Sequence, residues 1–311
     1  MELQLKNIGM IKEANIKLDG LTVIAGENDT GKSTVGKALF AVLKNDDEYL
    51  IPVLFRQNFL LVGSSISLTT KDGIYTISGK DNRFPSIGTW GENIKEKVIF
   101  IESPLVWNFT DFFRDIAQIE SQMNIKLDYP FLMKDLNFKL HIKSDSNGVD
   151  IKKEMISLMG GEFKKDELGR YYFDKQGQKI DLLNTATGIK TFGIFQVLSQ
   201  NNYLNENAVL VLDEPEVHLH PKWQLEMAKV IVELVKNGVK ILVNSHSPYM
   251  IEALQRYGEL VEVSSDFYLA EDGYIKKEND SNSETLAKVF EKLSEPFDVF
   301  EEMDMERLLN V

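Results

Sequence analysis

The stretch that decides the fold is Gly26-Glu27-Asn28-Asp29-Thr30-Gly31-Lys32-Ser33, a complete GxxxxGK[ST] motif. The apolar segment Leu21–Ala25 precedes it and the run Val35–Leu43 follows it, so the pattern predicts a strand, a loop and a helix. Such a loop binds phosphate because its backbone N–H groups curl around the oxygen atoms in conformations that a Cβ would obstruct. The amino end of the following helix adds orphan N–H groups and a positive dipole end.

These features predict a site for ATP with Mg²⁺. Lys32 supplies a positive charge to the phosphates, and Ser33 offers its hydroxyl to the metal ion. The residues expected to contact the nucleotide are Gly26, Asn28, Asp29, Thr30, Gly31, Lys32, Ser33 and Thr34. A glycine-rich turn without a nucleotide is the alternative, and the flanking strand and helix argue against it.

A second block indicates hydrolysis. The apolar run Val209–Leu212 ends in Asp213 and Glu214, as expected of a strand that is buried on both faces and delivers carboxylates to the edge of a parallel sheet. We expect Asp213 to hold Mg²⁺ and Glu214 to orient and deprotonate the attacking water. Catalysis of phosphoryl transfer depends mainly on positioning the reactants and neutralising their charge. The alternative interpretation is that the two acids only end the strand at a solvated turn and have no part in catalysis.

A third apolar strand, Val239–Asn244, leads into Ser245-His246-Ser247-Pro248. His246 at the end of this strand is placed to hydrogen-bond the γ-phosphate, whereas an isolated strand-end histidine is more often structural. A zinc site built from His218, His220 and His246 with Glu216 is a further alternative, since imidazole and carboxylate suit that metal.

Together these segments resemble the ABC-type ATPase heads of SMC-like chromosome-maintenance proteins, recombination-repair ATPases and OLD nucleases, and above all the compact OLD-like ATPases of bacterial defence operons. The resemblance is carried by four segments, Leu3–Leu18, Gly26–Thr34, Leu212–Pro221 and Asn244–Pro248. It implies an α/β fold: a P-loop NTPase of the ABC type with a mixed central sheet, an antiparallel β subdomain and a helical insertion. It also implies one domain over residues 1–311.

Heads of this family carry a signature loop that reaches across a dimer to the partner's γ-phosphate. The best candidate is Asn184–Lys190, in which Thr187 keeps a hydroxyl and Gly188 keeps close backbone approach at the start of a helix. An ordinary N-cap is the alternative. Lys190 is expected either to add a positive charge in trans or to lie solvated on the helix surface. The family's Q-loop glutamine has no clear counterpart, and Glu102 or Ser103 occupies its expected place.

The rest of the chain predicts how the head is organised. A hairpin is expected from Ile66–Thr69 and Tyr75–Ile77, with Asp72-Gly73 as its turn. Residues of about 105–180 are expected to form an insertion that contains a helix over Asp111–Met123. The insertion lacks the sustained heptad pattern that a long coiled coil requires. The acidic tail, about 286–311, is expected to be a partly helical solvated segment or a docking helix for a partner. Its expected apolar anchors are Phe290, Leu293, Phe297 and Phe300.

Bulk properties narrow the function classes. The 311 residues include no cysteine, which excludes disulfides and thiolate metal sites, and no apolar run long enough to span a membrane, so a cytoplasmic protein without a membrane role is expected. The net charge of −13 disfavours a broad nucleic-acid surface but leaves room for a local basic patch.

The expected function is therefore that of a Mg²⁺-dependent ATPase that works as a nucleotide-gated homodimer or higher homo-oligomer. It would regulate an effector, a nuclease or a toxin, encoded in the same operon of an anti-phage defence system. A DNA-repair or DNA-end-binding SMC-like ATPase is the alternative. A transporter subunit ranks last, because it would need a membrane partner and usually carries a conventional signature sequence.

Overall fold

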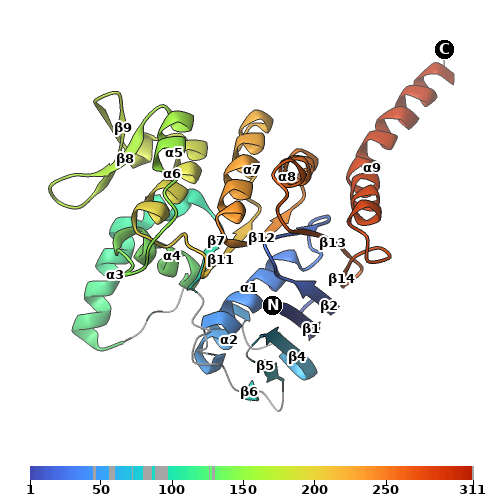
Figure 1. Cartoon of the computed structure of the whole chain (residues 1–311), viewed down its shortest axis with the longest axis horizontal. Helices are drawn as coiled ribbons and strands as arrows, with labels where there is room; N and C mark the ends of the chain where they lie inside the picture. The colour runs from blue at the N-terminus through green and yellow to red at the C-terminus, as the bar shows by residue number, and fades with distance from the viewer. Residues whose placement is uncertain are drawn as a thin grey trace.

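The computed structural model describes residues 1–44, 47–55, 60–71, 73–79, 86–87, 97–125, 127 and 130–309. The central feature is an eleven-stranded sheet with the order β6-β5-β4-β1-β2-β14-β13-β3-β12-β11-β7, flanked by helices (Figure 1). A separate sheet has the order β10-β9-β8. The mixed α/β architecture expected from the sequence is confirmed.

The parallel part of the large sheet forms its centre. Its strands are β3 (Leu21–Ala25), β7 (Lys97–Ile101), β11 (Ala208–Asp213), β12 (Lys240–Ser245) and β13 (Ser265–Glu271). Alternate side chains enter two different hydrophobic cores: Ile241 and Val243 of β12 lie in one, and Leu242 lies in the other. A strand that is buried on both faces must be apolar along its whole length, which explains the continuous apolar runs.

The antiparallel part lies beside this centre. Its strands are β1 (Glu2–Ile8), β2 (Ile11–Lys17), β4 (Leu60–Thr70), β5 (Gly73–Ser78) and β6 (Ser86–Ile87). Strand β14 (Tyr274–Lys276) joins the two parts, because it pairs parallel with β2 and antiparallel with β13. The predicted hairpin is confirmed, because β4 and β5 pair with Ile66 opposite Ile77 and Leu68 opposite Tyr75. Asp72, expected in its turn, lies outside the described residues.

Helices cover both faces of the sheet. Side chains of α1 (Lys32–Lys44) and α2 (Asp47–Phe55) fill one core, and those of α6 (Thr187–Gln200), α7 (Pro221–Lys236) and α8 (Pro248–Leu260) fill the other. Helix α6 is buried on most sides, because its run of Phe192, Ile194, Phe195, Val197 and Leu198 is fully covered. Helices α1 and α6 therefore pack in different layers.

The insertion contains the predicted helix and adds several elements. They are η1 (Pro104–Phe109), α3 (Thr110–Met123), α4 (Phe131–His141), α5 (Lys152–Met159), β8 (Glu162–Lys165), β9 (Tyr171–Lys175), β10 (Gln178–Asp181) and η2 (Leu182–Asn184). Trp107, Phe163 and Phe173 of this region lie in the same core as β11 and α6. This shared core supports the proposal that the insertion and the head form one domain.

The tail forms α9 (Asn282–Leu309), whose first turns pack on the head and whose end leads away from it (Figure 1). Leu286 and Val289 are buried, and Phe290 and Leu293 pack against the core as expected. The expectation for Phe300 is wrong, because this side chain is 59% exposed. The side chain of Phe297 lies outside the described residues.

Candidate nucleotide site

The carboxyl ends of β3, β11 and β12 meet at one edge of the sheet. Strand β12 lies between the other two, with Asn244 opposite both Asp213 and Ile24, and Ser245 opposite Ala25. Because the three strands run parallel, the loops that follow them emerge side by side. The phosphate loop, the acidic pair and the histidine segment are therefore brought together as the sequence predicts.

The phosphate loop needs glycine at two positions for reasons of space. Gly26 has φ +155°, and a Cβ there would lie 2.5 Å from the carbonyl oxygen of Ala270. Gly31 has φ +91°, and a Cβ there would lie 2.7 Å from Cγ1 of Ile11. The loop is thus shaped by close backbone approach and by a left-handed residue at its end.

Lys32 begins α1 and is buried, with 5% exposure. Its ammonium donates hydrogen bonds to two carbonyl oxygens of the same loop, at 2.9 Å to Gly26 and also to Glu27. Burial lowers the pKa of Lys32, and the nearby charges of Glu214 and Asp213 oppose that shift. A buried ammonium bonded only to neutral carbonyls is a good partner for an anionic phosphate, so the residues present fit ATP.

Ser33 and Asp213 provide a donor set for a hard cation. The Ser33 hydroxyl donates to Asp213 Oδ1 at 3.0 Å, and the Asn244 side-chain amide donates to the same oxygen at 2.8 Å. Burial raises the pKa of Asp213, the two hydrogen bonds counter this, and the charge of Glu214 raises it further. A carboxylate beside a hydroxyl is chemistry that suits Mg²⁺.

Asn244 is a site residue that the sequence reasoning did not single out. It is fully buried, and its Oδ1 accepts no hydrogen bond from the described residues. Its backbone oxygen accepts from the Glu214 N–H at 2.9 Å. Asn244 therefore ties the acidic pair to β12, and the only signal for it was a polar residue at the end of an apolar strand.

Glu214 and His246 face each other across this edge. Glu214 adopts the left-handed conformation with φ 51°, which turns the chain sharply after β11. Its Oε1 lies 3.3 Å from Nδ1 of His246, and both side chains keep about a third of their surface exposed. The predicted base and the predicted phosphate contact are thus neighbours.

The other histidines are placed differently. His220 Nδ1 accepts from the Lys222 N–H at 3.3 Å, which makes His220 the cap of α7. Glu216 Oε1 accepts from the Ser245 hydroxyl and from two backbone N–H groups. Within the described ranges no group of three histidine or acidic side chains is arranged to hold a metal ion. The zinc alternative is therefore not supported by the arrangement of the described residues.

Thr187 and Gly188 form the first turn of α6. The residue before them, Ala186, is the N-cap and makes no side-chain capping hydrogen bond, so the alternative in which Thr187 caps the helix is wrong. Lys190 is 4% exposed and donates to Asn108 Oδ1 at 2.8 Å. A solvated Lys190 is therefore also wrong, because this lysine instead ties α6 to η1.

The Q-loop region lies after β7. Ser103 caps η1, since its hydroxyl oxygen accepts from the Leu105 N–H at 3.2 Å. Glu102 keeps some solvent exposure, and its pKa is raised first by partial burial and also by the charge of Asp213, with Lys37 opposing. The role of Glu102 in place of the Q-loop glutamine stays a prediction.

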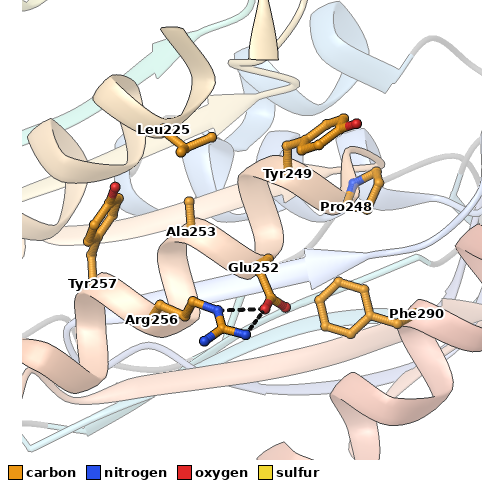
Figure 2. Close-up of a pocket in the computed structure, with 8 residues that line it drawn as sticks. All are labelled: Leu225, Pro248, Tyr249, Glu252, Ala253, Arg256, Tyr257 and Phe290. Atoms are coloured by element: carbon orange, nitrogen blue, oxygen red, sulfur yellow. Dashed lines mark hydrogen bonds and ion pairs between the residues drawn. The ribbon is translucent and has the colours of Figure 1, made fainter. Parts of the chain in front are cut away.

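A separate apolar groove opens between α7, α8 and α9, as Figure 2 shows. It has a volume of about 500 Å³ and is lined mainly by apolar side chains, among them Leu225, Ala253 and Phe290. Arg256 lies at its edge, 74% exposed and paired with Glu252 of the same helix. The groove contains none of the predicted nucleotide residues.

Comparison with known proteins shows the family to which the chain belongs. The family model described as an AAA ATPase domain matches residues 92–251, which is just over half of the chain. The Septu protein PtuA of Bacillus thuringiensis is 21% identical over 301 residues, covering 85% of this chain and 76% of that protein. The Retron Vc95 probable ATPase of Vibrio cholerae is 31% identical over 90 residues, covering 25% of this chain and 17% of that protein.

Solved structures agree on the fold. An SMC head bound to the C-winged helix domain of ScpA has a TM-score of 0.54 and 15% identity, covering 88% of this chain and 95% of that one. An SMC head with an extended coiled coil, bound to the C-terminal domain of ScpA derived from Pyrococcus furiosus, has a TM-score of 0.51 and 12% identity, with 88% and 94% covered. Among the described residues, no helix is long and apolar enough to cross a membrane. The chain belongs to the AAA ATPase domain family and is an ATP-hydrolysing enzyme with the fold of an SMC-type head.

Proposed function

We propose that this ATPase works as a nucleotide-gated homodimer that regulates a separately encoded effector, a nuclease or a toxin, in bacterial anti-phage defence. The observation that carries the proposal is the meeting of Lys32, Asp213, Glu214 and His246 at one sheet edge. These four side chains supply charge, a metal ligand, a base and a phosphate contact.

Each side chain has one proposed role. Lys32 exchanges its two loop carbonyls for phosphate oxygens when ATP binds. Ser33 and Asp213 hold Mg²⁺, which when bound neutralises charge on the phosphates. Glu214 orients and deprotonates the attacking water, and His246 contacts the γ-phosphate. The backbone of residues 26–34 holds the remaining phosphate oxygens.

The dimer rests on the start of α6. Phosphoryl transfer develops negative charge, and Lys32 is the only cation among the proposed site residues of one chain. The first N–H groups of α6 are not capped by a side chain, and Thr187 and Gly188 are half-buried there. A second protomer that presents this helix start to the γ-phosphate would complete the site, because a helix amino end favours an anion.

The defence role rests on the relatives. A Septu protein aligns over most of the chain and a retron ATPase over part of it, in keeping with the resemblance to defence-operon ATPases. The second candidate is an ATPase that binds DNA ends; the likeness to SMC heads is one of fold and does not decide between the two candidates. DNA binding that appears only with ATP and falls steeply with salt would favour that candidate.

Mixed variants test the composite site. Lys32→Ala and Gly188→Glu proteins should each be inactive, because one damages the phosphate loop and the other puts a negative charge on the helix that faces phosphate. Mixed together, they should form dimers with one intact site and regain part of the ATPase rate. Ser294→Glu, which adds the same charge on an exposed position of α9, is the matched control and should stay active alone.

A crosslinked mixed dimer decides the outcome. Binding of ATP at one site is expected. Binding at neither site would contradict the trans arrangement, whereas binding at one site without hydrolysis would show that both sites must act together.

A further inference from the structure

Glu216 is a buried carboxylate to which the roles above give no part. It lies in the turn between β11 and α7 and is 4% exposed. Its Oε1 accepts hydrogen bonds from the Ser245 hydroxyl at 2.7 Å, the His246 N–H at 2.9 Å and the Ser247 N–H at 3.2 Å. Three donors of one segment converge on one oxygen, so Glu216 fixes the backbone that carries His246.

The second oxygen of this carboxylate lacks such donors. Glu216 Oε2 is buried and accepts no hydrogen bond from the part of the chain that the structure describes. His246 Nδ1 is also buried and makes no hydrogen bond to the described residues. A buried polar atom without a partner costs free energy, so both atoms are placed to gain from a rearrangement.

The imidazole nitrogen lies between two carboxylates. Nδ1 of His246 is 3.3 Å from Glu214 Oε1 and 3.6 Å from Glu216 Oε1. Neither contact is a well-formed hydrogen bond, and the two lengths differ little. A small rotation of the ring therefore moves Nδ1 from one carboxylate to the other.

We propose that Glu216 is a positioning residue that competes with Glu214 for Nδ1 of His246. With Nδ1 on Glu216, the carboxylate of Glu214 is released to act on the attacking water, while the backbone of residues 245–247 stays in place. The inference rests on the proposed function, because it takes Glu214 as the base and His246 as the γ-phosphate contact. No bond is made or broken in this step.

A neutral connection supports the same segment from the other side. The Ser247 hydroxyl donates to Gln224 Oε1 at 2.6 Å, and the Gln224 amide donates to the Leu219 carbonyl at 3.0 Å. Helix α7 is thus linked to the start of α8 by hydrogen bonds between uncharged groups. Glu216 differs from this connection because it is a carboxylate and its Oε1 lies 3.6 Å from Nδ1 of His246.

Glu216→Gln separates the two parts of its role. The glutamine oxygen can still accept from residues 245–247, but the side chain loses the negative charge that attracts His246 Nδ1, and the amide that replaces Oε2 cannot accept a hydrogen bond from it. We expect kcat to fall about tenfold, the scale on which outer partners of active-site side chains act, with KM for ATP within about twofold. Arg256→Gln, at an exposed position of α8, is the control and should keep both values.

A double-mutant cycle shows whether Glu216 acts through the histidine. The Glu216→Gln, His246→Ala double variant should be no slower than His246→Ala alone. A wild-type kcat for Glu216→Gln, or losses that multiply in the double variant, would overturn the inference.

Two further outcomes are informative. If His246→Ala turns over at the wild-type rate, the proposed role of His246 fails and Glu216 loses its own with it. If His246→Ala is slow and Glu216→Gln is not, only the inference fails.

Should Glu216→Gln not fold, as judged by thermal unfolding, Ser245→Ala removes one of the three donors and should lower kcat with KM unchanged. An unchanged kcat in that variant would overturn the inference as well.

Discussion

Replacing Lys32 by alanine separates nucleotide binding from folding. The ammonium is buried and donates to the carbonyls of Gly26 and Glu27, its hydrogen-bond partners among the described residues, and burial lowers its pKa. Removing the ammonium abolishes the free-energy cost of burying a charge, which favours folding. Removing the aliphatic part of the side chain loses packing contacts, which disfavours folding. These changes oppose each other, so we expect the unfolding free energy to stay within about 1 kcal/mol of the wild-type value.

The effect on ATP should be large. A hydrogen bond to a charged group contributes about 1.5–3 kcal/mol, so loss of two phosphate contacts should weaken ATP binding roughly a hundredfold or more. Turnover should disappear with it.

Thermal unfolding with and without ATP measures both effects in one experiment, because a ligand stabilises only the state that binds it. The wild-type midpoint should rise with ATP and that of Lys32→Ala should not, at nearly equal midpoints without ATP. Lys6→Ala, an exposed lysine on β1, is the control and should respond as the wild type does. Equal ATP-induced shifts in wild type and Lys32→Ala, or hydrolysis by a clean preparation of Lys32→Ala, would refute the assignment.

Three further predictions follow from other contacts. Glu214→Gln should retain ATP and accumulate a stable dimer by size measurement, whereas Asp213→Asn should lose Mg²⁺-dependent affinity; normal hydrolysis by Glu214→Gln would place the base elsewhere. Gly193→Ala should destabilise the fold by about 1–3 kcal/mol in urea unfolding, because a Cβ there would lie 2.4 Å from the ring of Phe163. Burial lowers the pKa of Lys139 from 10.5 to about 8, so the unfolded chain binds more protons between these values and this group's contribution to stability should rise with pH across that range. Lys139→Met should lack this rise, and an identical pH dependence would contradict it.

The phosphate loop, the acidic pair and the histidine segment could be predicted because each follows a strand that is apolar along its length. The segment Ile241–Val243 shows the reason. Its side chains enter the cores on both faces of the sheet, so every position of the strand must be apolar, and the sequence shows a continuous apolar run. The hairpin of β4 and β5 was predicted from its two strand-like runs and the turn signal between them, and its register came from the structure.

The roles that could not be predicted from the sequence depend on contacts that no spacing rule describes. Asn244 and Glu216 depend on the strand order that places β12 beside β11, so that the turn after Asp213 folds over the next strand end. Lys190 was misjudged because its burial depends on Asn108, which lies 82 residues earlier in the chain.

The strand order also determines the stage of protein synthesis at which the sheet can form. Strand β3 lies between β12 and β13, and the Lys17 N–H donates to the Tyr268 hydroxyl across 251 residues. At about 5–20 residues per second, a ribosome that has made the phosphate loop needs roughly 12–50 s to deliver the strands that flank it. Until then α1 lacks β11 and β12, two of the strands on which it packs. A nascent chain that ends before β12 should therefore carry the complete phosphate motif, have no ATPase activity and depend on chaperones to remain unaggregated.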